Sequence, residues 1–214
     1  MIDPRILKII VMTTFFIVMF FIQGCEPKLV SEESLQEYVR ETSNGLSQTV
    51  KREGIEVSAF YRPTDLIVAQ DLRQKDRNAV AVRQLREKYG SYAYFVLSMS
   101  YDGKDALYAT AGSYQEFSDN LQKLSFRMPE YLYMTTSEKD TVELRDFHFS
   151  RMHGMSGSTQ VLLAFEKDKI EYKEWIQLNL KEMGFGTGRV NLRFRMKDIL
   201  DTPEIDFFNK GNYL

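Results

Sequence analysis

The chain has 214 residues and a mass of 25.1 kDa, a size typical of one domain or a small pair of domains. Hydrophobic residues make up 43% and aromatic residues 13% of it, which favours strands and a sizeable core over disorder. A formal net charge of −2 gives no strong field that would mark nucleic acid as a partner, and a single cysteine excludes an internal disulfide.

The N-terminal segment begins with a short charged stretch and continues with an apolar run. Arg5 and Lys8 precede residues 9–22, which are apolar apart from Thr13 and Thr14. The run is 14 residues long, within the range of about 7–15 for the core of a signal peptide. A membrane-spanning helix usually needs about 20 apolar residues, so the run is short for a permanent span.

The apolar run ends in Ile22-Gln23-Gly24-Cys25, which contains the only cysteine of the chain. This motif resembles the lipobox of bacterial lipoproteins. The resemblance implies transfer of a diacylglyceryl group, with palmitate-type chains, to the Cys25 thiol and then cleavage between Gly24 and Cys25. It divides the chain into a signal peptide (1–24), a tether (25–30) and a single α+β domain (31–214). The alternative is an uncleaved membrane anchor in which the cysteine is incidental.

The lipoprotein interpretation also predicts where the protein lies. Two or three acyl chains hold a protein stably on a bilayer, whereas one chain binds only marginally. The residue after Cys25 is Glu26 and not the aspartate that goes with inner-membrane retention in enteric bacteria, which favours the outer membrane. The expected partners are therefore the membrane, through acylated Cys25, and an envelope protein or glycan.

The first half of the body predicts helices around one strand. Ser31 opens a predicted helix that reaches Arg52, with Gly54 as its stop. This helix either packs on the domain's own sheet, which we favour, or binds a partner close to the membrane. Residues 55–61 alternate between apolar and polar side chains and predict a strand with one buried face, which Pro63 ends.

Two more helices are predicted after that strand. Thr64 is a candidate cap for the first, and residues 78–90 form the second. The charged residues 73–77 between them are either a turn or part of one long helix.

Residues 91–110 predict a β-hairpin that turns at Asp102-Gly103. Ser113 and Glu116 then form a capping box, which predicts a short helix.

From Tyr131 onward the pattern is almost entirely that of strands. The last two strands are expected to pair as an antiparallel hairpin. The chain is therefore predicted to be an α+β protein, with N-terminal helices packed on an antiparallel β-sheet or sandwich formed mainly by the C-terminal half. The predicted strands of this half are 131–136, 141–151, 159–166, 174–182 and 188–196.

Residues 146–158 carry the most suggestive chemistry. They contain Asp146, His148, His153 and Ser156, including both histidines of the chain. Two histidines and a carboxylate could bind zinc, and Asp146 and His148 would share one face of a strand. A zinc site would still need an oriented second shell, so we favour ordinary strand and loop roles for both histidines.

Two glycine-rich stretches partly match known motifs, the nucleophile elbow and the phosphate-binding loop. Gly154-Met-Ser-Gly-Ser158 lacks the last glycine of the nucleophile elbow G-x-S-x-G and lies between two strands. Gly184-Phe-Gly-Thr-Gly188 matches no phosphate-binding loop, and a strand follows it. The first is predicted to be a loop and the second a tight glycine hairpin.

The last two predicted strands carry a further candidate surface. A basic row could meet lipid head groups or an acidic glycan, or could simply be the solvated face of a sheet. Trp175 lies opposite the apolar row of its strand and could stack on a sugar, anchor an interface, or be covered by a helix. The basic row comprises Arg189, Arg193, Arg195 and Lys197.

The chain contains no complete catalytic set, and no cofactor or metal is expected. We therefore predict a lipid-anchored envelope lipoprotein with a non-catalytic binding, structural or assembly role. The alternative is a lipid-anchored hydrolase or metal-dependent enzyme that uses Asp146, His148 and His153. The Phe- and Tyr-rich body resembles uncharacterised lipoproteins of the Bacteroidota.

Overall fold

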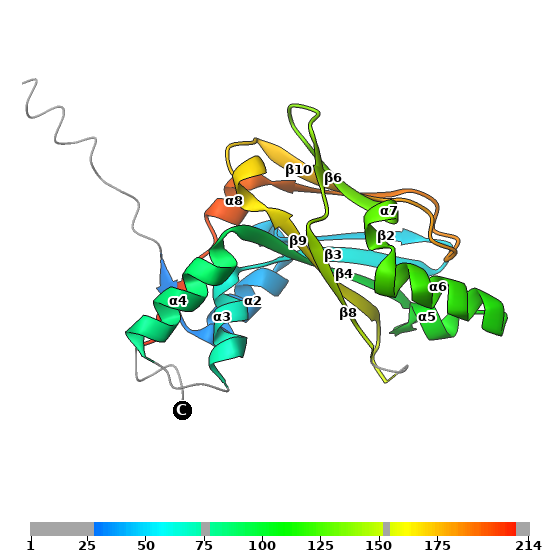
Figure 1. Cartoon of the computed structure of the whole chain (residues 1–214), viewed down its shortest axis with the longest axis horizontal. Helices are drawn as coiled ribbons and strands as arrows, with labels where there is room; N and C mark the ends of the chain where they lie inside the picture. Colours follow the sequence, from blue (N-terminus) through cyan, green and yellow to red (C-terminus); the bar gives the residue numbers. More distant parts are fainter. Residues whose placement is uncertain (1–27, 74–77, 152–154, 209–214) are drawn as a thin grey trace, which may run out of the picture.

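The computed structural model describes residues 28–73, 78–151 and 155–208 (Figure 1). It confirms the predicted α+β class with antiparallel sheets. The predicted signal peptide, Cys25 and His153 lie outside the described residues.

The larger sheet has strands from both halves of the chain. β4 lies at its centre, between β3 and β9, and all neighbours run antiparallel. The short β5 (Lys104–Asp105) pairs with the end of β4 and confirms the turn predicted at Asp102-Gly103. The main path of the sheet is β2 (Ser47–Arg52), β3 (Ile55–Arg62), β4 (Tyr92–Tyr101), β9 (Thr159–Glu166) and β8 (Asp146–Ser150).

The smaller sheet comes entirely from the second half and is also antiparallel. Its last two strands pair as the predicted hairpin. Rings from the two sheets meet in the interior, where the centroids of Phe95 on β4 and Phe194 on β11 are 5.2 Å apart. The strand order is β11 (Val190–Arg195), β10 (Trp175–Leu180), β6 (Leu132–Thr136) and β7 (Thr141–Glu143).

The alternation of apolar and polar residues explains this packing, because successive side chains of a strand point to opposite faces. Every second residue of β3, from Ile55 to Tyr61, is buried, and so are Val190, Leu192 and Phe194 of β11. The buried apolar side chains form one continuous cluster with members from both halves.

The helices gather at two places (Figure 1). The N-terminal group α2, α3 and α4 lies at one end, and α5, α6 and α7 lie towards the other. Polar side chains cap four of these helices, because the first N–H groups of a helix have no internal partner: Ser31 caps α2, Asn78 caps α4, Asp105 caps α5 and Ser113 caps α6. The helices are α2 (Glu32–Arg40), α3 (Thr64–Leu72), α4 (Ala79–Gly90), α5 (Ala106–Ala109), α6 (Tyr114–Phe126), α7 (Met128–Tyr131) and α8 (Met196–Leu200), with 3₁₀ turns η1 (Thr42–Asn44) and η2 (Lys167–Lys169).

The described chain starts and finishes side by side. β1 (Leu29–Val30) pairs in parallel with β12 (Glu204–Ile205), so the end of the predicted tether belongs to the folded body. Buried Asp65 on α3 fixes this pair, since its carboxylate accepts hydrogen bonds from Arg86 on α4 and from the backbone N–H of Ile205. Among the described helices, none is long and apolar enough to cross a membrane.

Four local predictions were wrong. Thr64 is the first residue of α3 and not its cap, and no side chain caps this helix. The helix predicted from Ser31 to Arg52 ends at Arg40, and β2 follows after Gly45, whose φ of +72° is a left-handed conformation that favours glycine. The predicted strand 141–151 is two strands, β7 and β8, in different sheets. The second arm of the predicted hairpin is short, because Asp105 caps α5.

Candidate functional site

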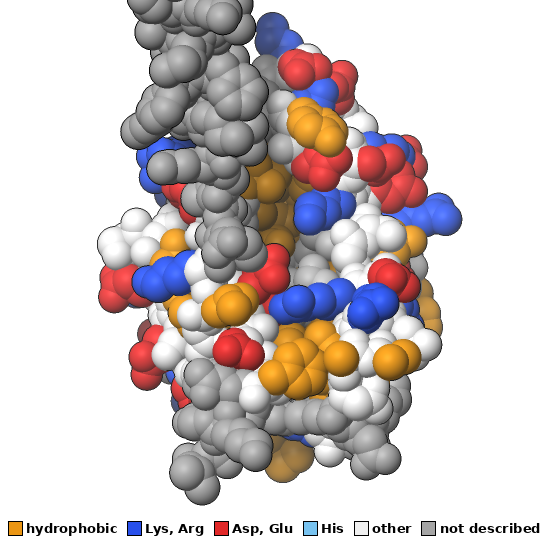
Figure 2. All heavy atoms as spheres, turned by 90° about the vertical axis from the view of Figure 1, so that its left-hand side faces the viewer, with side chains coloured by type: hydrophobic (Ala, Val, Ile, Leu, Met, Phe, Trp, Pro, Cys, Tyr) orange, Lys and Arg blue, Asp and Glu red, His pale blue; other side chains and the backbone are white. Residues whose placement is uncertain are grey.

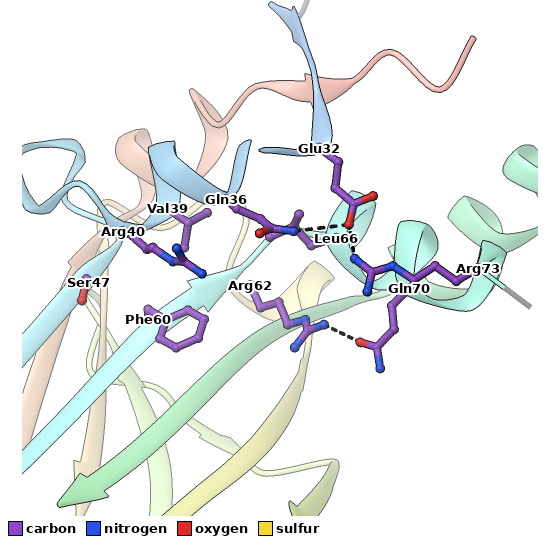
Figure 3. A pocket seen from close by; sticks show the side chains of 10 residues that line it. All are labelled: Glu32, Gln36, Val39, Arg40, Ser47, Phe60, Arg62, Leu66, Gln70 and Arg73. Atoms are coloured by element: carbon purple, nitrogen blue, oxygen red, sulfur yellow. Dashed lines mark hydrogen bonds and ion pairs between the residues drawn. The ribbon is translucent and has the colours of Figure 1, made fainter. Parts of the chain in front are cut away.

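A pocket of about 430 Å³ lies between α2, α3 and the outer face of β2 and β3 (Figure 3). This volume is within the range of about 300–1,000 Å³ for small-molecule sites. Three arginine side chains project into it, and one carboxylate accompanies them. The lining residues are Glu32, Gln36, Val39, Arg40, Ser47, Phe60, Arg62, Leu66, Gln70 and Arg73.

Simple periodicity places these side chains together. On β3, Phe60 and Arg62 point away from the core, because the alternate residues Ala59 and Tyr61 point into it. Ser47 on β2 is the register partner of Phe60. The α2 residues that line the pocket are spaced by three or four along the helix, as are those of α3, so each set lies on one helical face: Glu32, Gln36, Val39 and Arg40 from α2, and Leu66, Gln70 and Arg73 from α3.

The pocket has an excess of positive charge. The Glu32 carboxylate is engaged by Arg73 Nη2 at 2.6 Å and by Gln36 Nε2 at 3.3 Å. Within the described residues, no carboxylate forms an ion pair with Arg40 or Arg62. Figure 2 views the end of the molecule formed by α2, α3 and α4, where acidic and basic side chains are interspersed over the surface. The excess is therefore a property of the pocket and not of a broad basic patch.

Arg62 carries the clearest sign of an incomplete site. Its Nη2 donates to Gln70 Oε1 at 2.5 Å, while its Nε is buried and has no hydrogen-bond partner. Among the side-chain nitrogens and oxygens of the described residues, this is the one buried atom left without a partner. Such a group is costly to bury, and in native proteins it usually has a partner such as water or a ligand.

The Nε and Nη2 atoms of a guanidinium form one edge with two parallel N–H groups. Two other arginines of this chain use this edge to bind both oxygens of a carboxylate. Arg86 donates from Nε and Nη2 to the two oxygens of Asp65 at 2.8 and 2.6 Å. Arg127 does the same to Glu130 at 2.9 and 2.6 Å. Arg62 presents the same edge to a single amide oxygen, which engages only one of its two nitrogens.

The electrostatics of the pocket agree with this geometry. Burial and then the neighbouring Arg73 cation lower the pKa of Arg62 below the usual arginine value. An anion in the pocket would offset both effects through its attraction to the guanidinium. Ser47 supplies the only hydroxyl among the lining residues, and none of those residues is a histidine, cysteine or lysine. The arrangement is therefore suited to binding an oxyanion.

None of these residues was singled out from the sequence. The spacing of polar residues by four in α2 can be read from the sequence. It indicates a site only when the fold brings α2 next to α3 and to the β2–β3 pair. The helix wrongly extended to Arg52 also hid Ser47, which lies on β2.

Comparisons with known proteins leave the function open. The chain matches no protein-family model and no curated protein. A crystal structure of a protein of unknown function from Burkholderia pseudomallei K96243 is similar at 9% identity, over 81% of this chain and 94% of that chain, with a TM-score of 0.35. A likeness at this TM-score supports no argument about function.

The predicted histidine site is only partly described. Asp146 and His148 lie on the same exposed face of β8, as expected from their spacing. The Asp146 carboxylate accepts the N–H of Phe147, and the Ser156 hydroxyl accepts the N–H of Ser158, so both have local structural roles. In the described ranges, no group of three metal-ligating side chains comes together. His148 does line a hollow of about 510 Å³ between β8 and α6.

The predicted basic row is interrupted. Arg193 and Arg195 project from β11, but Lys197 belongs to α8. The Arg193 guanidinium lies 4.0 Å from the centre of the Trp175 ring and donates to Gln177. A side chain of the same sheet thus occupies one face of the ring, which leaves less of it for stacking on a sugar.

The glycine-rich loop between β10 and β11 is longer than the predicted tight hairpin. Its backbone N–H groups converge on the Glu182 carboxylate, which accepts from residues 184, 185, 186 and 188 at 2.5–3.0 Å. Such a nest of N–H groups suits an anion, and the Glu182 carboxylate is the anion here.

We expect Glu182 to stabilise the protein in a pH-dependent way. Burial raises its pKa, but the four N–H groups outweigh burial, so the pKa lies below the usual value of about 4.3. Its contribution is therefore present above about pH 4.3 and is lost as the pH falls through the lowered pKa. Glu182→Gln should cost about 1 kcal/mol at pH 7, since the nest is partly solvated.

Urea unfolding at pH 7 and pH 3 measures this effect. The difference between wild type and Glu182→Gln should shrink at pH 3, and Glu87→Gln on the exposed side of α4 serves as the charge-matched control. A difference that is the same at both pH values would contradict the assignment.

Proposed function

We propose that this chain is a lipid-anchored bacterial envelope lipoprotein with a non-catalytic binding role. In this proposal Cys25 carries the acyl chains, the outer membrane is the location, and the arginine-lined pocket is the binding site. The partner is a component of the envelope with an oxyanion group, carried by a protein, a glycan or a smaller molecule.

The unpaired Nε of Arg62 is the observation that carries the binding role. Among the described residues, neither Arg62 nor the exposed Arg40 has a carboxylate partner, and the buried Nε of Arg62 lacks a hydrogen bond when the pocket is empty. Retaining such a cost in the folded state is typical of functional sites. The anchor rests on the motif at residues 22–25 and on the apolar run before it.

Expression of the full chain in a bacterium with a palmitate analogue tests the anchor. The wild type should incorporate the label and remain with the membrane after a carbonate wash, whereas Cys25→Ala should lose at least nine-tenths of the label. Gln23→Ala is the control and should keep the label, because that position of the motif tolerates variation. Mass spectrometry that found an unmodified Cys25 thiol in the wild-type protein would refute the anchor.

A further inference from the structure

The pocket next to Arg62 combines two kinds of surface. The polar part of the lining includes the Arg62 guanidinium, whose Nε and Nη2 form one edge, and the Arg40 side chain, and the apolar part is formed by Val39, Phe60 and Leu66 (Figure 3). A ligand that satisfies both needs a charged head and an apolar body.

We propose that the pocket binds a small amphiphilic acid, namely a carboxylate or phosphate attached to a short apolar group. The oxyanion lies on the Nε–Nη2 edge of Arg62, and the apolar group packs against Val39, Phe60 and Leu66. This inference deepens the proposed function, on which it rests, by naming the class of ligand.

The geometry of the Arg62 edge selects an oxyanion. Two oxygens on one atom match the two parallel N–H groups of a guanidinium, as the pairs made by Arg86 and Arg127 show in this chain. In the structure, Gln70 Oε1 accepts a hydrogen bond from Nη2 alone, and Gln70 lies on the exposed side of α3. An incoming oxyanion displaces the Gln70 oxygen and engages both nitrogens, so the buried Nε gains the partner that it lacks.

The apolar wall selects the rest of the ligand. Val39 is buried and Phe60 and Leu66 are half-buried, so their exposed surface faces the hollow. Transfer of apolar surface out of water is favourable, which gives an acid with a short hydrocarbon chain an advantage over a bare anion. Arg40 also lines the pocket and keeps its local potential positive.

Isothermal titration calorimetry of the full chain in phosphatidylcholine nanodiscs tests the proposal with three probes. Hexanoate supplies both head and chain, hexanol supplies the chain alone and inorganic phosphate supplies the head alone. Hexanoate should bind one to one, at least tenfold more tightly than either of the others. Equal affinities for hexanoate and hexanol, or no binding of hexanoate, would overturn the proposal.

A variant pair tests the role of the Arg62 edge. Arg62→Lys keeps the charge but removes the two-nitrogen edge, so hexanoate should bind at least tenfold more weakly. Arg52→Lys, on the exposed part of β2, is the matched control and should leave the affinity unchanged. An equal affinity in wild type and Arg62→Lys would overturn the assignment. The comparison of hexanoate with hexanol uses the unchanged chain, so it decides the matter even if Arg62→Lys fails to fold.

A change of lipid distinguishes two sources of the same chemistry. If membrane phospholipid fills the site, nanodiscs of phosphatidylglycerol should weaken hexanoate binding at least tenfold by competition. If a soluble acid is the ligand, the affinity should not change, and either result supports the site. Binding of hexanoate by a chain that proves not to be acylated would refute the anchor alone, and an acylated chain that ignores hexanoate would refute this inference alone.

Discussion

Gln70→Glu should stabilise the folded protein and weaken the binding of hexanoate. The substituted carboxylate would lie where an oxyanion ligand is proposed to lie, and it would offer one oxygen to each nitrogen of the Arg62 edge. Replacing a neutral acceptor by a charged one on an arginine is worth about 1 kcal/mol, which corresponds to a rise of about 2–4 °C in Tm. Because the site would then be occupied by the chain itself, affinity for hexanoate should fall at least tenfold.

Two further variants isolate the cause. Gln84→Glu adds the same charge on the exposed side of α4 and should change neither Tm nor affinity. Gln70→Ala removes the amide oxygen and should lower Tm slightly while leaving hexanoate free to bind. A Gln70→Glu protein that is less stable than wild type, or that binds hexanoate as well as wild type does, would show that the Arg62 edge is not the anion site.

Asp65→Asn should cause the largest loss of stability among the variants considered. The Asp65 carboxylate is 8% exposed and accepts from Nε and Nη2 of Arg86 and from the N–H of Ile205 at 2.7 Å. Asparagine offers one oxygen, and its amide group would face a donor. The substitution removes a buried charged acceptor from two donors, but Arg86 is partly exposed and keeps Glu204 at 3.5 Å, so the expected cost is about 2 kcal/mol, or about 4–8 °C in Tm.

The Arg127–Glu130 pair provides a control of matched geometry. It has the same two-bond arrangement but lies in solvent, where an ion pair contributes little. Glu130→Gln should therefore leave Tm within experimental scatter. Thermal unfolding followed by circular dichroism measures both variants, and an equal effect of the two substitutions would refute the structural role given to Asp65.

Part of the architecture could be predicted from the sequence because side-chain alternation is a local property. The alternating residues of β3, β10 and β11 each indicated one buried face, and the Asp102-Gly103 turn indicated its hairpin. The partners of a strand are not a local property. For that reason residues 141–151 were predicted as a single strand, although the chain passes there from one sheet to the other.

The candidate site was beyond sequence reasoning for a related reason. Arg62 had the position of an ordinary solvated residue at the end of an alternating strand, and only the burial of its Nε against α2 and α3 makes it unusual. The sequence-based candidate site was placed at the histidines because their residue type is rare in the chain. Rarity of a residue type carries information about chemistry only when other groups converge on it.

The pairing of β1 with β12 has a practical consequence for anyone who studies this protein in cells. Leu29 is four residues after Cys25, so an acylated Cys25 would hold this strand pair within about 14 Å of the lipid surface. A fluorescent reporter fused after β12 would then compete with the bilayer for the same space. An insertion in the turn at Glu138–Lys139, between β6 and β7, would keep the reporter away from that strand pair.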